Sequence, residues 1–164
     1  MCFAKRFILL IVVLVSCVGC DQTTKSIAMS VLPTTEPWSC LGDTVRLQLV
    51  FNRGAFLSLG SSLPEAWRKG VLTYAVSWLL LGTLAYALLS KRQHPSVVLA
   101  TALVFAGGAG NLFDRMTHDG LVVDFINVGI GPFRTGIFNI ADISITVGAL
   151  FFFWATLHQK HKRC

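Results

Sequence analysis

Two aspartates stand where a carboxylate is costly. Asp124 is the only charged residue in LVVDFINVGIGPF, and Asp142 ends the block FNIAD directly before an uncharged stretch. A charge in apolar surroundings needs a partner, and turn-forming residues lie between the two, so we expect the carboxyls to face each other. Two carboxyls in contact share one proton, so the ionised member can take a proton from water while the neutral member polarises a carbonyl. The pair predicts the chemistry of an aspartic peptidase.

Other kinds of catalytic site lack the residues that they need. The four histidines have no metal-ligand spacing, and no Gly-x-Ser-x-Gly occurs in the sequence. Cys17 and Cys20 form a C-x-x-C pair inside an apolar run, without a histidine or a second pair nearby, which is typical of small core residues. We therefore expect neither a metal nor a cofactor.

Long apolar stretches must position the aspartates. Of the 164 residues, 54% are hydrophobic and 13% are charged, whereas about 25% of residues in soluble domains are charged. Each stretch is close to the ~20 residues that cross a bilayer. We therefore expect one all-α membrane domain comprising residues 1–164, with four spans at about 7–29, 71–89, 96–113 and 138–157.

Basic residues mark one end of these spans. Lys5 and Arg6 precede the first span, Lys91 and Arg92 lie between the second and third, and the cluster Lys160–Arg163 ends the chain. The positive-inside rule makes that side cytoplasmic. We therefore expect both termini inside and the two aspartates near the outer face. Anchors at span ends explain the net charge of +6 without nucleic-acid binding.

The two outer segments between the spans carry strand patterns. A second run, GLVVDFINV, is ended by the turn formers Gly129, Gly131 and Pro132. We expect a small extracytoplasmic β-rich cradle and loop at the bilayer surface, where Trp38 and Trp67 suit an interfacial belt. In the first run, alternation at period two predicts one strand face formed by Val45, Leu47, Leu49 and Phe51.

The start of the chain also has the pattern of a lipoprotein signal peptide. Lys5 and Arg6 precede an apolar run, and Leu14–Cys17 reads as the lipobox at which such leaders are cut. A secreted lipoprotein would have a polar body, however, whereas this body is apolar. Removal of the first span would also leave the termini on opposite sides of the membrane. We therefore expect a retained span.

Polar residues gather at the outer ends of the spans. Asp21 and Lys25, four positions apart, lie on one helix face and form either a stabilising pair or part of a site. Asp142 alone could be a helix-starting acid, and Asp114–Arg115 a solvated corner. Ionisable groups at membrane depth nevertheless predict a functional site by default. The neighbouring polar residues are Asn52, Asn111 and Asn139.

Five blocks, in this order along the chain, resemble one known family. They are DQTTK (Asp21–Lys25), NRGAF (Asn52–Phe56), GGAGNLFDR (Gly107–Arg115), VVDFI (Val122–Ile126) and FNIAD (Phe138–Asp142). Over essentially the whole chain, the sequence resembles the lipoprotein signal peptidases, the type II signal peptidases of bacteria. The resemblance implies an intramembrane aspartic endopeptidase of the bacterial cytoplasmic (inner) membrane. It would remove the signal peptide from diacylglyceryl-modified prolipoproteins, cutting before the lipidated cysteine.

The resemblance also implies roles for single residues. Asp124 and Asp142 match the catalytic pair, and the partners would be prolipoprotein substrates and membrane phospholipid around a monomer. The block NRGAF departs from the family pattern, because Phe56 comes one place early. The remaining matches are the site-lining Asn52, Asn111, Arg115 and Asn139, the structural polar pair Asp21 and Lys25, and a supporting Asp114.

Two rival classes stay open. A small transporter or channel could use an intramembrane acid as a proton relay, although no internal inverted repeat is visible. The second rival class is a structural membrane protein or a lipoprotein itself. A lipoprotein would be processed at Cys17. The five ordered blocks favour the peptidase over both.

Overall fold

The structure, a computed structural model, describes residues 2–54, 64, 67, 70–90 and 94–161. Within these residues, four helical segments are long and apolar enough to cross a membrane, with mean hydropathies of 1.7 to 2.2. The predicted architecture of four membrane helices is confirmed, whereas the expectations for Phe56, Lys91 and Arg92 lie outside the described residues. The segments are α1 (Phe3–Val31), a π-helical turn η2 (Val71–Ala75) continued by α3 (Val76–Leu89), α4 (Pro95–Thr117) and α5 (Ile140–His161).

The observed helices lie within a few residues of the predicted spans. α1 runs from Phe3 to Val31, against the predicted 7–29, so Asp21 and Lys25 lie inside the helix. α5 begins at Ile140 and not at Phe138. Phe138 instead forms an antiparallel bridge with Ile126, and the backbone N–H and carbonyl groups of the two residues bond each other. The bridge therefore joins to β3 a residue, Phe138, that hydropathy alone assigned to the fourth span.

α4 is the central helix of the bundle. In its most apolar window 56% of the residues are buried, against 11% to 22% in the other three helices. Glycines allow α5 to approach it closely: a Cβ on Gly107 would meet the carbonyl oxygen of Ala141, and one on Gly148 would lie 2.9 Å from the carbonyl oxygen of Ala100. Small residues serve the same purpose at helix interfaces in membranes generally. The close contact fixes the position of the first turn of α5 along the axis of α4.

A buried arginine joins the first helix to the end of α3. Arg6 is only 3% exposed, and its Nη1 donates hydrogen bonds to the carbonyl oxygens of Ala87 and Ser90. These carbonyls belong to the last turn of α3 and to its C-cap residue, where a cation is favoured by the helix dipole. Arg6 is therefore a helix cap, whereas the neighbouring Lys5 is exposed as expected of an anchor.

The predicted cradle is a four-stranded antiparallel sheet. Its strands are β1 (Trp38–Cys40), β2 (Val45–Asn52), β3 (Val122–Ile130) and β4 (Phe133–Arg134), and they lie in the order β1-β2-β3-β4. β3 runs through Gly129, which was expected to end it. A Cβ at Gly129 would collide with the carbonyl oxygen of Phe133, so glycine here permits the tight return of the chain into β4.

The pairing of β2 with β3 contains an irregularity. Leu47 pairs with Ile126, and Val50 pairs with Asp124, so β2 uses one residue more than β3 between these two pairs. This is the count of a β-bulge, which leaves one residue unpaired and reverses the side to which all later side chains point.

The bulge overturns the predicted strand face and brings an asparagine to Asp124. Phe51 pairs with Val123 and therefore lies on the opposite side of the sheet from Asp124. Asn52, which pairs with Val122, lies on the same side as Asp124. The prediction that one face is shared by Val45, Leu47, Leu49 and Phe51 is therefore wrong at Phe51.

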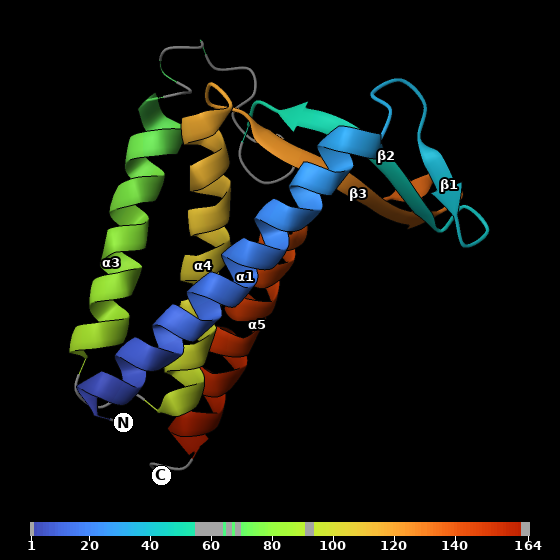
Figure 1. Ribbon diagram of the computed structural model, residues 1–164. Coiled ribbons are helices and arrows are strands. Elements are labelled where there is room, and N and C mark those ends of the chain that lie inside the picture. The colour runs from blue at the N-terminus through green and yellow to red at the C-terminus, as the bar shows by residue number, and fades with distance from the viewer. Residues whose placement is uncertain (1, 55–63, 65–66, 68–69, 91–93, 162–164) are drawn as a thin grey trace.

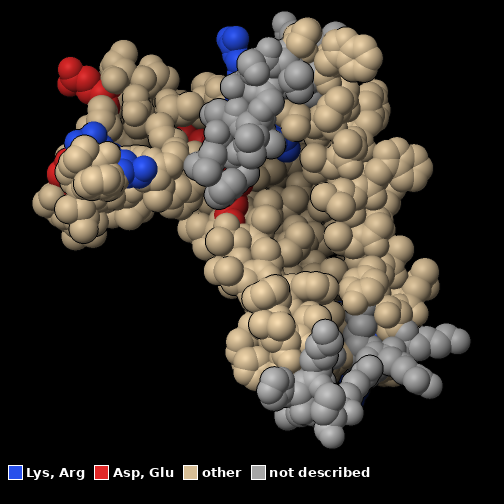
Figure 2. All heavy atoms as spheres, turned by 180° about the vertical axis from the view of Figure 1, so that it is seen from behind, with Lys and Arg blue, Asp and Glu red and all other residues tan. Residues whose placement is uncertain are grey.

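The sheet and the chain ends lie at opposite ends of the bundle. Figure 1 shows the first turn of α1 and the last turn of α5 at one end, and the sheet extending sideways from the other end. α1 crosses α4 and α5 obliquely. On the face drawn in Figure 2, charged side chains gather at the end that carries the sheet, while the middle of the helices is uncharged. This is the distribution expected of a bundle surrounded by lipid.

Candidate active site

Asp142 is held at the start of α5 by a reciprocal pair of hydrogen bonds. The N–H of Asp142 donates to Asn139 Oδ1 (2.9 Å), and the N–H of Asn139 donates to Asp142 Oδ2 (3.2 Å). This is a capping-box arrangement, with asparagine at the N-cap and aspartate three residues later. The other carboxylate oxygen, Oδ1, accepts from Asn111 Nδ2 (2.9 Å). Asp142 is thus a helix-starting acid, and the cap also fixes the direction of its carboxyl.

Asp124 lies on β3 and is bound by two asparagines. Asn139 Nδ2 donates to its Oδ1 (2.7 Å), and Asn52 Nδ2 donates to its Oδ2 (2.8 Å). Asn139 therefore contacts both aspartates: its oxygen caps the helix at Asp142, and its nitrogen holds Asp124. The two acids predicted to face each other are brought together by this one side chain.

The environment of Asp124 favours its protonated form. The residue is 2% exposed, and burial raises the pKa of its carboxyl to about 7. The hydrogen bond from Asn52 opposes this rise, whereas the nearby charge of Asp142 adds to it. At neutral pH a substantial fraction of the Asp124 carboxyl is therefore protonated.

A small polar cavity borders both carboxyls. Its volume is about 10 Å³, at the lower limit of the ~10–15 Å³ that a water molecule needs. Arg115 also lines it and donates to the carbonyl oxygens of Asn111 (3.3 Å) and Gly54 (3.2 Å). Its Nε is buried and has no hydrogen-bond partner among the described residues. The lining residues are Asn52, Gly54, Asn111, Arg115, Val122, Asp124 and Asp142.

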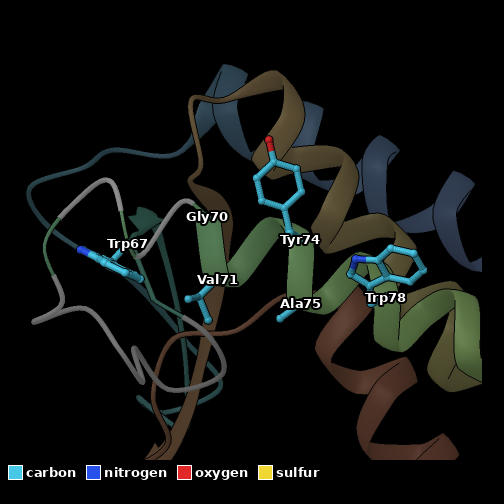
Figure 3. A pocket seen from close by; sticks show the side chains of 6 residues that line it. All are labelled: Trp67, Gly70, Val71, Tyr74, Ala75 and Trp78. Carbon is cyan, nitrogen blue, oxygen red and sulfur yellow. The ribbon is translucent and has the colours of Figure 1, made fainter.

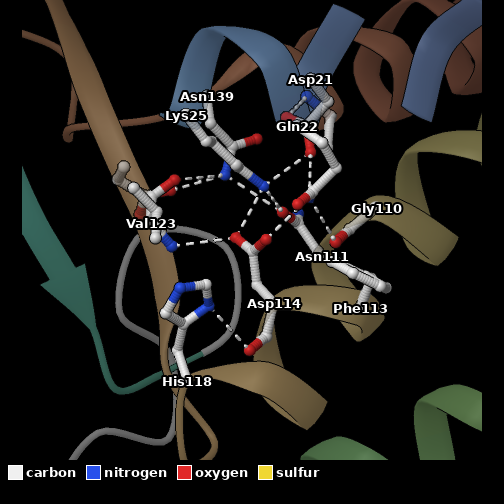
Figure 4. A network of polar contacts seen from close by, with 12 residues as sticks. Asp21, Gln22, Lys25, Gly110, Asn111, Phe113, Asp114, His118, Val123 and Asn139 are labelled. Atoms are coloured by element: carbon white, nitrogen blue, oxygen red, sulfur yellow. Dashed lines mark hydrogen bonds and ion pairs between the residues drawn. The ribbon is translucent and has the colours of Figure 1, made fainter. Parts of the chain in front are cut away.

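Behind the pair lies a buried cluster of charges, which we call the Lys25 clamp: Lys25 with Asp21 and Asp114. Lys25 Nζ lies 2.7 Å from Asp21 Oδ2 and 2.7 Å from Asp114 Oδ2. It also donates to Asn111 Oδ1 (3.1 Å). Figure 4 shows the ammonium group at the centre of these contacts. All three charged side chains are at most 1% exposed. The expected ion pair between Asp21 and Lys25 is therefore present and buried, and Asp114 is a second acid paired with the same lysine.

The clamp holds the backbone next to each paired aspartate. Asp21 Oδ1 accepts from the N–H of Ala141 (2.9 Å), and Asp114 Oδ2 accepts from the N–H of Val123 (3.0 Å). Ala141 directly precedes one paired aspartate, and Val123 directly precedes the other. Asp21 of α1 and Asp114 of α4, both paired with Lys25, therefore bind the two segments that carry the aspartate pair. The interpretation of Asp114 and Arg115 as a solvated corner pair is wrong, because these side chains are 0% and 8% exposed.

Sequence reasoning missed Gln22 as part of this site. Its Nε2 donates to Asp114 Oδ1 (2.8 Å), to Asp21 Oδ2 (3.1 Å) and to the carbonyl oxygen of Gly110 (3.4 Å). A glutamine inside a helix carries little signal by itself. Its place beside Asp21 in the block DQTTK was the available indication.

The described residues contain a larger hollow at the start of η2 that offers no comparable chemistry. It measures about 540 Å³, and its described lining residues are Trp67, Tyr74 and Trp78 with small or apolar neighbours, none of them a carboxylate or a basic side chain. Figure 3 shows the Trp67 ring across this hollow from Val71. Within the same residues, no group of three or more His, Cys, Asp or Glu side chains could hold a metal ion. The polar cavity between the aspartates is therefore the candidate active site.

Known proteins share this arrangement of helices and sheet. A solved structure described as a bacterial membrane enzyme, determined by the in meso method at 2.3 Å resolution, superposes with a TM-score of 0.83 at 26% identity. The match covers 94% of this chain and 91% of that one. A second structure described in the same words, at 1.9 Å resolution, gives 0.76 at 27% identity, over 90% and 92% of the two chains. The fold is that of a multi-pass bacterial membrane enzyme.

Sequence comparison gives the family. Residues 12–158 match the family described as signal peptidase (SPase) II. A protein of Azoarcus sp. (strain BH72) named lipoprotein signal peptidase is 36% identical over 149 residues, which cover 88% of this chain and 80% of the relative. One of Chlorobium phaeobacteroides with the same name is 34% identical, over 79% and 78% of the two chains. The chain belongs to the signal peptidase II family and is a peptidase of the bacterial inner membrane.

Proposed function

We propose that this chain is an aspartic endopeptidase that removes the signal peptide from diacylglyceryl-modified prolipoproteins, cutting directly before the lipidated cysteine. The observation that carries the proposal is the pair itself: Asp124 and Asp142 border one polar cavity and are bridged by Asn139. Membership of the signal peptidase II family, whose relatives are named lipoprotein signal peptidases, supports the substrate class.

The chemistry follows from a pair of carboxyls that share one proton. Water in the cavity loses a proton to the ionised aspartate as its oxygen attacks the scissile carbonyl carbon. The neutral aspartate donates its proton to the carbonyl oxygen, and the resulting diol collapses with cleavage of the C–N bond while a proton passes to the leaving amine. The pKa of Asp124, about 7, suits a group that must hold and release this proton near neutral pH.

The neighbouring polar side chains supply orientation. Asn111 and Asn139 each bond a carboxylate of the pair, so they limit how far either carboxyl rotates. Arg115 lines the cavity with a buried Nε that has no partner among the described residues. We assign this donor to an oxygen of the bound substrate, next to the scissile bond.

We further propose that the pair works near the outer face of the membrane, with both chain termini in the cytoplasm. The basic residues at the span ends support this orientation. The sheet, which carries Asp124, then lies at the outer surface, where a lipidated precursor reaches it sideways from the bilayer. The acyl chains of the precursor stay in the outer leaflet throughout.

Cleavage of a diacylglyceryl-modified prolipoprotein by the purified chain in detergent tests the proposal. We expect Asp124→Asn and Asp142→Asn each to lose activity by at least ~10³-fold, because neither variant retains the shared proton. Asp119→Asn is the matched control. Asp119 is exposed and has a positive φ of 56°, a conformation that asparagine adopts as readily as aspartate.

Each outcome separates the alternatives. Cleavage before the lipidated cysteine by the unchanged chain and by Asp119→Asn, but by neither other variant, is the expected result. Retained cleavage in Asp124→Asn or Asp142→Asn removes that residue from the catalytic role. An unchanged chain that cuts no lipidated precursor, but conducts protons in liposomes, would place it among transporters.

A further inference from the structure

A second cavity opens beside the aspartate pair, on the side of α5 that faces away from the bundle core. It measures about 480 Å³ and lies between the β4–α5 connection and the first two turns of α5. Its wall is largely apolar and includes Phe138, Ile143 and Val147. Ile143 is 42% exposed and Val147 is 49% exposed on a helix apolar enough to span a membrane. The cavity is therefore open to the lipid side.

Asp142 belongs to the walls of both cavities. It borders the small polar cavity that it shares with Asp124, and it also borders the apolar one. A group bound in the apolar cavity therefore lies directly next to the carbonyl on which the pair acts. In the proposed reaction the scissile bond directly precedes the lipidated cysteine, so the glyceryl lipid is attached to the residue that supplies the leaving nitrogen.

Arg134 adds a polar donor to this apolar wall. Its Nε donates to Asn127 Oδ1, and its Nη1 donates to the carbonyl oxygen of Asp43 (2.8 Å). Its Nη2 is buried and has no hydrogen-bond partner among the described residues. A buried donor without an acceptor is costly, and an acceptor of a bound ligand would offset that cost. A carbonyl oxygen of a fatty acyl ester is such an acceptor, at the end of an apolar chain.

We propose that the cavity between β4 and α5 is the subsite for the glyceryl fatty-acyl ester of the substrate, with Arg134 Nη2 donating to an ester carbonyl and Ile143 and Val147 contacting the acyl chain. This inference rests on the proposed function. The subsite selects for lipid modification, because only a precursor with an acyl chain fills the cavity beside Asp142. Ile143, Val147 and Arg134 are then specificity-determining residues.

The size of the cavity distinguishes an acyl chain from the signal helix. One turn of an α-helix, about 11 Å across and 5.4 Å long, occupies about 500 Å³. The cavity therefore holds no more than a single turn of a transmembrane signal peptide, whereas its volume is typical of sites for small ligands, about 300–1,000 Å³. The signal helix accordingly lies outside this cavity.

The first test measures acyl-chain selectivity. The unchanged chain is given lipopeptides of one sequence that carry dipalmitoylglyceryl or dibutyrylglyceryl cysteine, and kcat and KM are determined for each. We expect a lower KM for the long-chain substrate. Val147→Trp fills the cavity and should reduce the ratio of the two kcat/KM values at least about tenfold, mainly through KM. Val12→Trp is the control, because Val12 is 56% exposed on α1 and does not line the cavity.

A second pair of substrates isolates Arg134. A glyceryl diether lacks the ester carbonyl but keeps the same alkyl chains. We expect the unchanged chain to prefer diester over diether by about tenfold, as for a hydrogen bond from a charged donor. Arg134→Met should remove that preference while Val12→Trp keeps it. An unaltered diester preference in Arg134→Met overturns the role of Arg134, and an unaltered chain-length ratio in Val147→Trp overturns the subsite.

A binding experiment keeps this inference separate from the proposed function. The probe is the lipopeptide with a photoreactive diazirine in one palmitoyl chain, and the adducts are mapped by mass spectrometry. We expect labelling of α5 at residues 143–147, displaced by unlabelled lipopeptide, whether or not the chain cleaves it. Labelling elsewhere refutes the subsite. Equal labelling by a diazirine phosphatidylglycerol that the lipopeptide does not displace shows a membrane-lipid site instead, and cross-links from the signal-peptide portion show that the helix occupies the cavity.

Discussion

Removal of the lysine from the Lys25 clamp should destabilise the folded chain strongly. In Lys25→Met, the hydrogen-bond acceptors each keep another donor: Asp21 Oδ2 keeps Gln22, Asp114 Oδ2 keeps Val123, and Asn111 Oδ1 keeps Asn139. The loss is therefore one of charge, because two carboxylates that are at most 1% exposed no longer share a cation. Removing one partner from a buried ion pair costs about 3–5 kcal/mol. We expect a loss of that size in the free energy of unfolding.

Equilibrium unfolding in mixed detergent micelles measures this free energy. Lys5→Met is the matched control, because Lys5 is exposed on the same helix, and a substitution at such a site changes stability by no more than about 0.5 kcal/mol. The triple variant Lys25→Met, Asp21→Asn, Asp114→Asn removes all three charges and keeps side-chain oxygens for the N–H groups of Ala141 and Val123. Replacement of whole buried ion clusters by neutral groups is often close to neutral. The triple variant should therefore regain at least half of the stability lost in Lys25→Met.

Two results would refute this reasoning. A loss below about 1 kcal/mol in Lys25→Met would mean that the clamp contributes no more than a surface ion pair. A triple variant less stable than Lys25→Met would mean that each aspartate contributes independently of the lysine, since coupled residues deviate from additivity.

Two further predictions concern the aspartate pair and the helix contact. Because burial raises the pKa of Asp124 from 3.8 to about 7, the folded chain binds this proton more tightly than the unfolded chain between these values, so the free energy of unfolding should fall as pH rises through that window. Asp124→Asn should remove this part of the pH dependence when unfolding is measured at intervals from pH 4 to 8, and an identical slope in the variant would contradict the assignment. Gly107→Ala should destabilise the chain by about 1–3 kcal/mol, because its Cβ would meet the carbonyl oxygen of Ala141. Gly82→Ala, where nothing lies within 4 Å of the added Cβ, should be neutral or stabilising by up to about 1 kcal/mol in the same unfolding assay.

The helices and the acid pair could be predicted from the sequence because both depend on local signals. A membrane span must satisfy its backbone internally, so about 20 apolar residues predict a helix without knowledge of its neighbours. Asp124 stood out because every residue near it is uncharged, and Asp142 because it directly precedes a span. The structure brings these two predicted residues to one cavity.

What escaped prediction depends on pairing between distant segments. The β2 bulge arises from the register between Leu47–Val50 and β3, and no residue type in VRLQLVFN marks it. A strict period of two therefore placed Phe51 on the wrong side of the sheet. The role of Gln22 likewise depends on α4, whose Asp114 and Gly110 accept its hydrogen bonds.

Three separate devices determine the geometry of the aspartate pair, and each acts on a different degree of freedom. The bulge turns Asn52 to the side of Asp124, Asn139 joins the strand to the helix, and the clamp holds the backbone one residue before each acid. Rotation of a carboxyl is therefore limited by asparagines, whereas translation of β3 against α5 is limited by Lys25. It follows that loss of an asparagine should alter the protonation of the pair first, while loss of the lysine should alter its spacing. Among the described residues, Lys25 forms no hydrogen bond or ion pair with Asp124 or Asp142. Its place in the same polar network is explained by this division, because it holds the backbone that carries the two acids.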